Sequence, residues 1–230
     1  GGDRKLVDSV WTRFAEGGLV GPLVPEVGGG LGLDEDALGA LFEELGRSGL
    51  PVPAAETIAV SAPLLYVANH PALAGVLAGD VMVTAKLGDG DLVPFGQQAD
   101  LVLLERDGGI RLYQRGALEL IALDSVDGSR GLARLDAVSA GELLTDDPDV
   151  IQAAWQHGVL ATSALLVGLG QRMLDLTVAY VLQREQFGGP IGRFQAIKHA
   201  LASALLALEF ARPAVLAAGW AQAQSEPDAA

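Results

Sequence analysis

Residues Arg184 to His199 read REQFGGPIGRFQAIKH and join two long apolar segments of this 230-residue chain. The preceding segment carries leucine, valine and methionine around most of its circumference, which is typical of a buried helix. The following segment repeats its apolar residues at helical spacing. Between the two, the run Gly188-Gly189-Pro190 favours a turn, because glycine and proline interrupt regular structure. The pattern therefore predicts a helical hairpin whose two arms meet at this junction.

The junction also gathers side chains suited to a flat, phosphate-bearing cofactor. Arg184 supplies a guanidinium, whose forked donors match phosphate oxygens. Gln186 and Gln195 supply amides, Phe187 supplies an aromatic wall, and the neighbouring glycines would allow the backbone to approach a ligand closely. A lone arginine at the end of a helix is more often placed there by the helix dipole. Spacing alone leaves these two interpretations open.

Outward from the junction, the apolar period changes twice. Four shorter helices are predicted toward the N-terminus, at Lys5–Ala15, Asp34–Gly46, Thr57–Ala68 and Pro71–Ala78. Short aliphatic runs separated by turn residues then predict a small antiparallel β region, with strands at Val81–Ala85, Leu101–Leu104, Ile110–Tyr113, Leu118–Leu123 and Leu132–Val138. The two long helices follow.

The long helices are expected from about Pro148 to Gln186, with a possible break near Gly168–Gly170, and from about Phe194 onward. Asp147 is a good cap for the first of them. The order of elements predicts an α+β fold that is mostly α. We expect three domains: helical over 1–80, β over 81–143, and a partial helical bundle over 144–230.

Composition excludes several classes of function. The net charge is −14 and the excess of acidic residues lies in 1–150, which argues against a nucleic-acid partner. The chain has no cysteine and only three histidines, so no metal site is expected. The uncharged run from Gly158 to Gly170 is shorter than a membrane span, and the N-terminus lacks a signal peptide. We therefore expect a cytoplasmic protein without a membrane partner.

The junction resembles the signature of the acyl-CoA dehydrogenase family. That family has Arg-x-x-Phe-Gly, then Ile or Leu, then Phe-Gln or His-Gln at the start of a helix, and every position matches over Arg184 to Gln195. The run from Gly168 to Asp175 is similar to the family's preceding helix. Near the front of the chain, Val24–Leu33 and Leu41–Arg47 are similar to a second family segment, in the right order.

The resemblance implies the family fold, with N-terminal helices, a middle β domain and a C-terminal four-helix bundle. It also implies FAD, whose ADP part would contact Arg184 and Gln195, with Gln186 and Phe187 as neighbours. An acyl-CoA substrate, a homologous subunit that shares the cofactor, and an electron-transferring flavoprotein as electron acceptor are the partners that it implies.

Two features of the family are missing from the sequence. The carboxylate base that removes the substrate's α-proton lies in one branch on a C-terminal segment, which this sequence does not contain. In the other branch the base is a glutamate whose position falls near Gly158, and neither that residue nor its neighbours carry a carboxylate. The Thr-Glu-Pro-x-Ala-Gly-Ser-Asp-like segment that holds the flavin ring is replaced by Val83–Gly90. We therefore assign no catalytic residue.

Three hypotheses follow from the resemblance. In the first, the chain is a subunit of a heteromeric acyl-CoA dehydrogenase that lends its FAD-binding edge to a partner carrying the base. In the second, it is a complete homo-oligomeric dehydrogenase whose base lies in a missing C-terminal segment. In the third, it is a structural subunit that binds no flavin.

Overall fold

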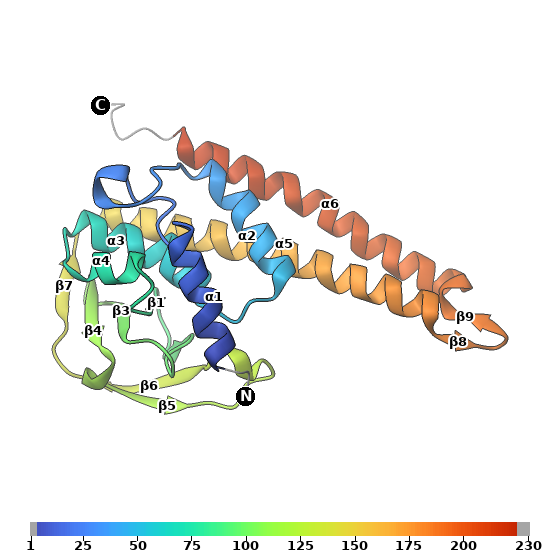
Figure 1. Cartoon of the computed structure of the whole chain (residues 1–230), viewed down its shortest axis with the longest axis horizontal. Helices are drawn as coiled ribbons and strands as arrows, with labels where there is room; N and C mark the ends of the chain where they lie inside the picture. Colours follow the sequence, from blue (N-terminus) through green and yellow to red (C-terminus); the bar gives the residue numbers. More distant parts are fainter. Residues whose placement is uncertain (1–3, 225–230) are drawn as a thin grey trace. The chain divides into compact units, whose positions relative to one another are not determined.

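The computed structural model describes residues 4–224, with side chains from residue 9 onward (Figure 1). Its α-helices are α1 (Arg4–Glu16), α2 (Asp36–Ser48), α3 (Ala62–Val67), α4 (Ala72–Leu77), α5 (Pro148–Gln183) and α6 (Gln195–Ala223). The longer strands are β1 (Val83–Lys86), β3 (Leu101–Arg106), β4 (Gly109–Gln114), β5 (Leu118–Ala122), β6 (Ala133–Val138) and β7 (Glu142–Thr145). Three two-residue strands complete the set, β2 (Leu92–Val93), β8 (Glu185–Gln186) and β9 (Gly189–Pro190). The fold is therefore α+β and mostly α, as the sequence predicts.

The chain forms two compact units. One unit contains Gly1–Asp34 and Pro51–Val159, and the other contains Glu35–Leu50 and Leu160–Ala230. Helix α2 therefore belongs with the C-terminal helices, although it lies early in the sequence. The first twelve residues of α5 belong to the first unit, and the rest of that helix belongs to the second.

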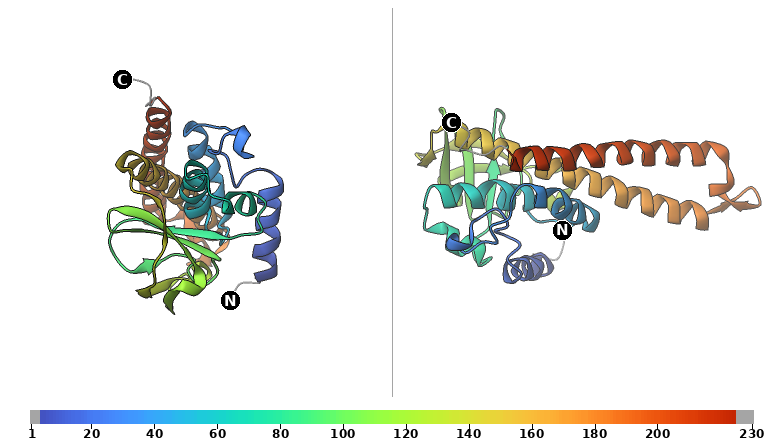
Figure 2. Two further views of the ribbon diagram at one scale, coloured as in Figure 1. Left: turned by 90° about the vertical axis from the view of Figure 1, so that its left-hand side faces the viewer. Right: turned by 90° about the horizontal axis from the view of Figure 1, so that it is seen from above.

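The first unit holds two small sheets (Figure 2). Their strand orders are β1-β3-β4-β7 and β2-β6-β5. The five strands predicted from the sequence are confirmed, whereas the two-residue strand β2 and the strand β7 were not predicted. All pairings within these sheets are antiparallel except that of β1 with β3. Those two strands run parallel because the chain leaves the first sheet after β1, forms β2 in the other sheet, and then returns.

Aliphatic side chains from several strands fill the interior of this β region. Val102 and Leu104 of β3 are fully buried, and Tyr113 of β4 is almost so. They pack with Val93, Ala99 and Leu118 into one apolar cluster. The short aliphatic runs that predict strands in the sequence thus also supply their buried side chains, and in β3 all four residues of Leu101–Leu104 are buried.

A π-helical segment replaces the beginning of the predicted helix Thr57–Ala68. Residues Ala55–Ser61 form wide turns, and α3 starts only at Ala62. Within these turns the Glu56 side chain is mostly buried and lies 3.0 Å from Nη2 of Arg130. Burial raises the pKa of the Glu56 carboxyl, and hydrogen bonding to its own backbone and the charge of Arg130 oppose that rise. Such turns are frequent at functional sites, yet the sequence gives no sign of this one.

In the second unit, α5 and α6 run antiparallel, with β8 and β9 at their tip (Figure 2). The break expected near Gly168–Gly170 is wrong, because α5 continues through these glycines. They serve helix packing instead. A Cβ atom on Gly168 would lie 1.9 Å from the Glu43 carbonyl oxygen of α2, and one on Gly46 would lie 2.1 Å from that of Leu165. The backbones of α2 and α5 therefore cross in direct contact, which only glycine permits.

Much of the apolar surface of α5 and α6 stays exposed in this chain. Both helices are long and apolar enough to cross a membrane by length and composition, but core helices of soluble proteins pass the same test. In the most apolar stretch of α5, 17% of the residues are buried, and in that of α6 none is fully buried. Side chains such as Leu206, Phe210 and Met173 are more than half exposed. An apolar surface of this extent is typical of an interface with another chain.

Candidate functional site at the hairpin tip

The predicted site residues lie together where α5 turns into α6. Strands β8 and β9 form a minimal hairpin in which Gln186 pairs with Gly189. Its two loop residues, Phe187 and Gly188, have φ angles of 53° and 82°. Left-handed backbone at both loop positions is the requirement of a type I′ turn, whose twist matches that of the flanking strands. The Gly-Gly-Pro run predicted a turn here, and the structure specifies its type.

Backbone hydrogen bonds fix the root of the hairpin. The N–H group of Arg184 donates to the Tyr180 carbonyl at 2.8 Å, which extends the α5 hydrogen-bonding pattern by one residue. The Arg184 carbonyl accepts from the N–H group of Ile191, also at 2.8 Å. Gln195 opens α6 a few residues later. Arg184, Gln186 and Gln195 are therefore all held on one short junction between two rigid helices.

The polar side chains of this junction are free to bind a ligand. Arg184, Gln186 and Gln195 are all exposed. Within residues 4–224 none of these three side chains makes a hydrogen bond or an ion pair with another part of the chain. A guanidinium without an internal partner is able to bind phosphate in a bidentate manner, and the amides offer both donors and acceptors. This donor set fits the diphosphate and base of a nucleotide.

Phe187 presents its ring to solvent from an unusual backbone conformation. The residue is 84% exposed, and its ring meets that of Phe194 edge to face with centroids 6.0 Å apart. A left-handed conformation costs a residue with a Cβ atom about 1–2 kcal/mol. An exposed aromatic ring held at that cost provides a surface on which a planar group can stack.

Arg193 is a residue of this junction that the sequence did not single out. Its Nη1 donates to the Gly188 carbonyl at 3.2 Å, and its Nη2 donates to the Phe187 carbonyl. The guanidinium carbon also lies 5.2 Å from the centroid of the Phe194 ring. The two-residue loop with an aromatic at its first position is the signal that could have indicated a supporting donor nearby, since a bulky residue seldom adopts positive φ unaided.

In the segment that replaces the flavin-ring signature, the backbone at Gly88 is bonded within the chain. The Gly88 N–H group donates to Oε2 of Glu105 at 2.7 Å, and Nε1 of Trp155 donates to the same oxygen at 2.8 Å. A Cβ atom on Gly88 would lie 2.6 Å from the Trp155 ring. The turn after β1 is therefore closed by a carboxylate and an indole from its own unit.

No carboxylate is present where one branch of the family would have its base. The nearest position along α5 is Gly158, and a Cβ atom there would lie 3.2 Å from Cγ2 of Val60. The neighbourhood is thus an apolar contact within the first unit. Among the described residues, no group of His, Asp or Glu side chains could hold a metal ion.

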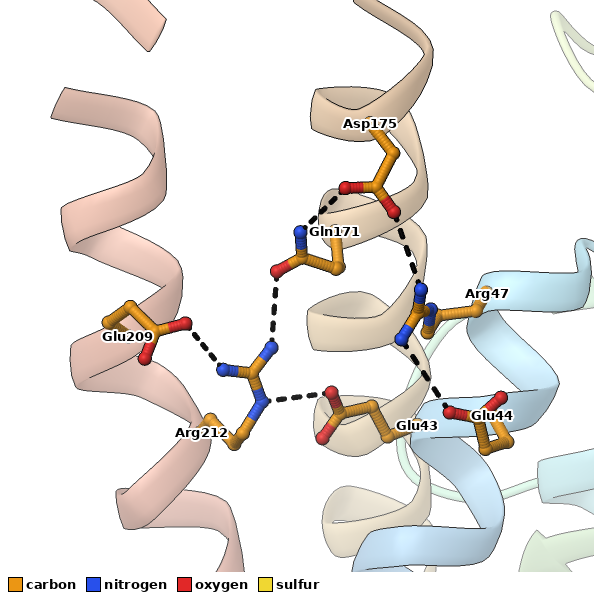
Figure 3. Close-up of polar contacts among 7 residues, drawn as sticks. All are labelled: Glu43, Glu44, Arg47, Gln171, Asp175, Glu209 and Arg212. Atoms are coloured by element: carbon orange, nitrogen blue, oxygen red, sulfur yellow. Dashed lines mark hydrogen bonds and ion pairs between the residues drawn. The ribbon is translucent and has the colours of Figure 1, made fainter. Parts of the chain in front are cut away.

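A second arginine-containing region of the same unit is fully paired (Figure 3). Arg212 of α6 donates to Glu43 of α2 at 2.9 Å, to Glu209 at 2.6 Å and to the side-chain oxygen of Gln171 of α5 at 3.2 Å. Gln171 in turn donates to Asp175 at 2.9 Å. Hydrogen bonding to Glu209 and Glu43 raises the pKa of Arg212. This network connects three helices and leaves no free group for a ligand.

Comparisons with known proteins agree with this architecture. Two family models match, described as the N-terminal domain of acyl-CoA dehydrogenase over residues 3–72 and the C-terminal domain of acyl-CoA dehydrogenase over residues 149–230. Acyl-CoA dehydrogenase IpdE2 of Mycobacterium tuberculosis is 33% identical over 215 residues, which cover 93% of this chain and 65% of that protein. Acyl-CoA dehydrogenase FadE34 of the same organism is 35% identical over 230 residues, with 94% and 32% covered.

Solved structures give the same result. The structure described as the Tcur3481-Tcur3483 steroid ACAD variant has a TM-score of 0.81 at 26% identity, with 95% of this chain and 70% of that chain covered. The ChsE4-ChsE5 complex from Mycobacterium tuberculosis has the same fold, with a TM-score of 0.81 at 22% identity and coverage of 96% and 72%. The chain spans about two thirds of the length of the first curated relative and about one third of the second. It belongs to the acyl-CoA dehydrogenase family.

Proposed function

We propose that this chain is a subunit of a heteromeric, FAD-dependent acyl-CoA dehydrogenase and supplies the edge of the site that grips the ADP part of the cofactor. One observation carries the proposal: Arg184, Gln186 and Gln195 are exposed at one junction, and their side chains have no partner among the residues that the structure describes. Unpartnered donors of this kind are suited to phosphate and to the edges of a base. Phe187 adds an exposed ring beside them.

FAD would supply the hydride acceptor for α,β-desaturation of an acyl-CoA thioester. The residues of this chain would bind and orient the nucleotide end. Arg184 would neutralise a phosphate charge, and Gln186 and Gln195 would direct hydrogen bonds to the ribose, the phosphate or the adenine. None of these side chains exchanges a proton with the substrate.

A homologous partner would carry the flavin ring and the base. The turn at Gly88 and the apolar contact at Gly158 support this division, because the Gly88 N–H group already donates to Glu105 and the Gly158 position carries no carboxylate. The exposed apolar faces of α5 and α6 supply a surface for the partner. The relatives named as the ChsE4-ChsE5 complex and the Tcur3481-Tcur3483 steroid ACAD are two-protein assemblies by their names, which further supports it.

The remaining parts of the proposal concern the setting of this site. We place the protein in the cytoplasm, with an acyl-CoA as substrate and electron-transferring flavoprotein as electron acceptor. We keep the division into domains at 1–80, 81–143 and 144–230 as a description of the sequence. A complete homo-oligomeric dehydrogenase, and a flavin-free structural subunit, are the two competing functions.

Co-purification separates these three functions. The chain is expressed alone and together with the product of an adjacent homologous gene, and each preparation is scanned for flavin absorbance. We expect a yellow complex only when both proteins are present, with acyl-CoA oxidation by the complex. Stoichiometric FAD and oxidation of acyl-CoA by the chain alone would favour the homo-oligomer. A colourless complex would favour the structural subunit.

A further inference from the structure

We propose that Arg193 is a positioning residue that holds Phe187 and Gln186 in the geometry needed to bind the nucleotide end of the cofactor. This inference rests on the proposed function, because it assigns a supporting residue to the same FAD site. Its basis is the pair of hydrogen bonds from one guanidinium to the carbonyls of Phe187 and Gly188, the two loop residues of the hairpin.

The clamp acts on the strained part of the hairpin. Phe187 has φ of 53°, a conformation that glycine or asparagine adopts far more readily than phenylalanine. The carbonyl groups of Phe187 and Gly188, which belong to two consecutive peptide groups, accept from the same planar fork, which fixes their mutual orientation. A loop that keeps a bulky residue at positive φ requires support from its surroundings. Arg193 is the side chain that provides it.

The hairpin is shaped to admit this guanidinium. A Cβ atom on Gly189 would lie 2.9 Å from Nη1 of Arg193. Gly189 does not have positive φ, so its backbone conformation does not require glycine. The absence of a side chain instead leaves room for the guanidinium. The Phe194 ring supports the other side of the guanidinium at 5.2 Å from the ring centroid. Arg193 is an exposed residue that contacts the loop carbonyls, Gly189 and Phe194, and both of its terminal nitrogens already donate to the loop.

The position of Gln186 depends on the same clamp. Gln186 and Gly189 are paired across the hairpin, and Phe187 follows Gln186 directly. If the loop relaxes, the strand pair loses its closing turn, and both side chains lose their fixed direction. Arg184 is less dependent, because its backbone is held by Tyr180 and Ile191. We therefore distinguish Arg184, which would bind the cofactor without help from the clamp, from Gln186 and Phe187, whose direction depends on Arg193.

The test uses two variants that disturb the clamp by different routes. Arg193→Gln removes the fork, whereas Gly189→Ala keeps the charge and displaces the guanidinium. Arg193→Lys keeps one donor and should restore part of the function. Gly116→Ala is the matched control, since a Cβ atom there meets nothing within 4 Å and its φ is not positive. All are prepared in the form that binds FAD, together with the partner if the complex is that form.

Two readouts are measured for each variant. The first is the rate of chymotryptic cleavage after Phe187, identified by mass spectrometry, which reports the rigidity of the loop without any cofactor. The second is FAD affinity, from quenching of flavin fluorescence. We expect both clamp variants to be cut faster at Phe187 and to bind FAD about tenfold more weakly, the loss expected for a charge-assisted hydrogen bond. Arg193→Lys should be intermediate, and Gly116→Ala should match the wild type.

The outcomes separate the two proposals. Unchanged cleavage at Phe187 in Arg193→Gln would overturn the clamp, whatever the cofactor does. Faster cleavage with unchanged FAD affinity would overturn the positioning role, provided that Arg184→Ala does weaken binding. If Arg184→Ala also leaves FAD affinity unchanged, the proposed function itself is wrong, and the positioning role is lost with it.

Discussion

Two regions of the second unit use arginine and glycine for opposite purposes. Where α2, α5 and α6 meet, Gly46 and Gly168 allow the helix backbones to touch, and Arg212 is fully paired by acids and an amide. At the hairpin tip, Gly188 permits a left-handed turn, and the Arg184 side chain has no partner within residues 4–224. The same residue types stabilise the fold in the first region and stay available in the second. Whether an arginine side chain is paired within the fold is therefore a better guide to its role than the mere presence of an arginine.

The largest expected effect comes from closing the space at the helix crossing. Gly168→Ala would place a Cβ atom against the Glu43 carbonyl oxygen and should separate α2 from α5. We expect a loss of about 3 kcal/mol in the free energy of unfolding, although alanine favours a helix over glycine. Urea denaturation measures this loss in the free energy of unfolding. Gly170→Ala is the control on the same helix, because its Cβ atom meets only the flexible end of Leu208. Equal stability of the two variants would contradict a backbone-to-backbone crossing.

The next effect tests whether the paired arginine stabilises the fold. Arg212→Leu leaves Glu43, whose side chain is only 18% exposed, without its partner. We expect a loss of about 2 kcal/mol from thermal or urea unfolding, the range for hydrogen bonds to charged groups. Arg47→Leu is the matched control, because Arg47 is 43% exposed and its acids lie 3.4 and 3.8 Å away. That variant should lose only about 0.5 kcal/mol, and an equal loss would mean that burial does not distinguish the two pairs.

At the tip the expectation is reversed, with binding affected and stability unchanged. Arg184→Ala should lower FAD affinity about tenfold, which is about 1.4 kcal/mol, and should leave the melting temperature unchanged. Flavin fluorescence and circular dichroism measure the two quantities. Arg172→Ala, which removes an exposed arginine of α5, should change neither. A fall in melting temperature for Arg184→Ala would assign this arginine to the fold and remove the contrast between the two regions.

The smallest effect concerns the ion pair between Glu56 and Arg130, in which a mostly buried carboxylate meets an exposed guanidinium. Burial raises the pKa of Glu56 in the folded protein, so the folded state holds this proton to higher pH than the unfolded state does. The group therefore lowers stability as pH rises above its unfolded value of 4.5. Glu56→Gln should be equal to the wild type at pH 4 and slightly more stable at pH 7, as measured by melting temperature. A less stable variant at pH 7 would mean that the ion pair outweighs desolvation.

The fold was largely predictable because the residues within each helix or strand indicate that element by their own pattern. The period of the apolar residues indicated α1, α2, α5 and α6 and the main strands, and it requires no knowledge of distant contacts. The prediction of a helix break at residues 168–170 was wrong because the role of these glycines depends on a contact with a distant helix. A glycine inside a helix pattern lowers helix propensity, and only the presence of α2 shows that these glycines serve a crossing.

The candidate site was predictable in its residues and not in its geometry. Arg184, Gln186, Phe187 and Gln195 stood out through the family resemblance, and whether they bind FAD is a proposal. The left-handed conformation of Phe187 and the hydrogen bonds of Arg193 depend on how the hairpin closes. Those features arise from contacts between residues that no pattern in the sequence ties together.

The exposed apolar stretch of α6 has a consequence for any measurement of stability. No residue of that stretch is fully buried within the described part of the chain, so the helix gains further hydrophobic stabilisation when another molecule covers it. Folding is then linked to association by mass action. The melting temperature should rise with protein concentration, and a value measured in dilute solution would describe a different equilibrium from one measured in concentrated solution.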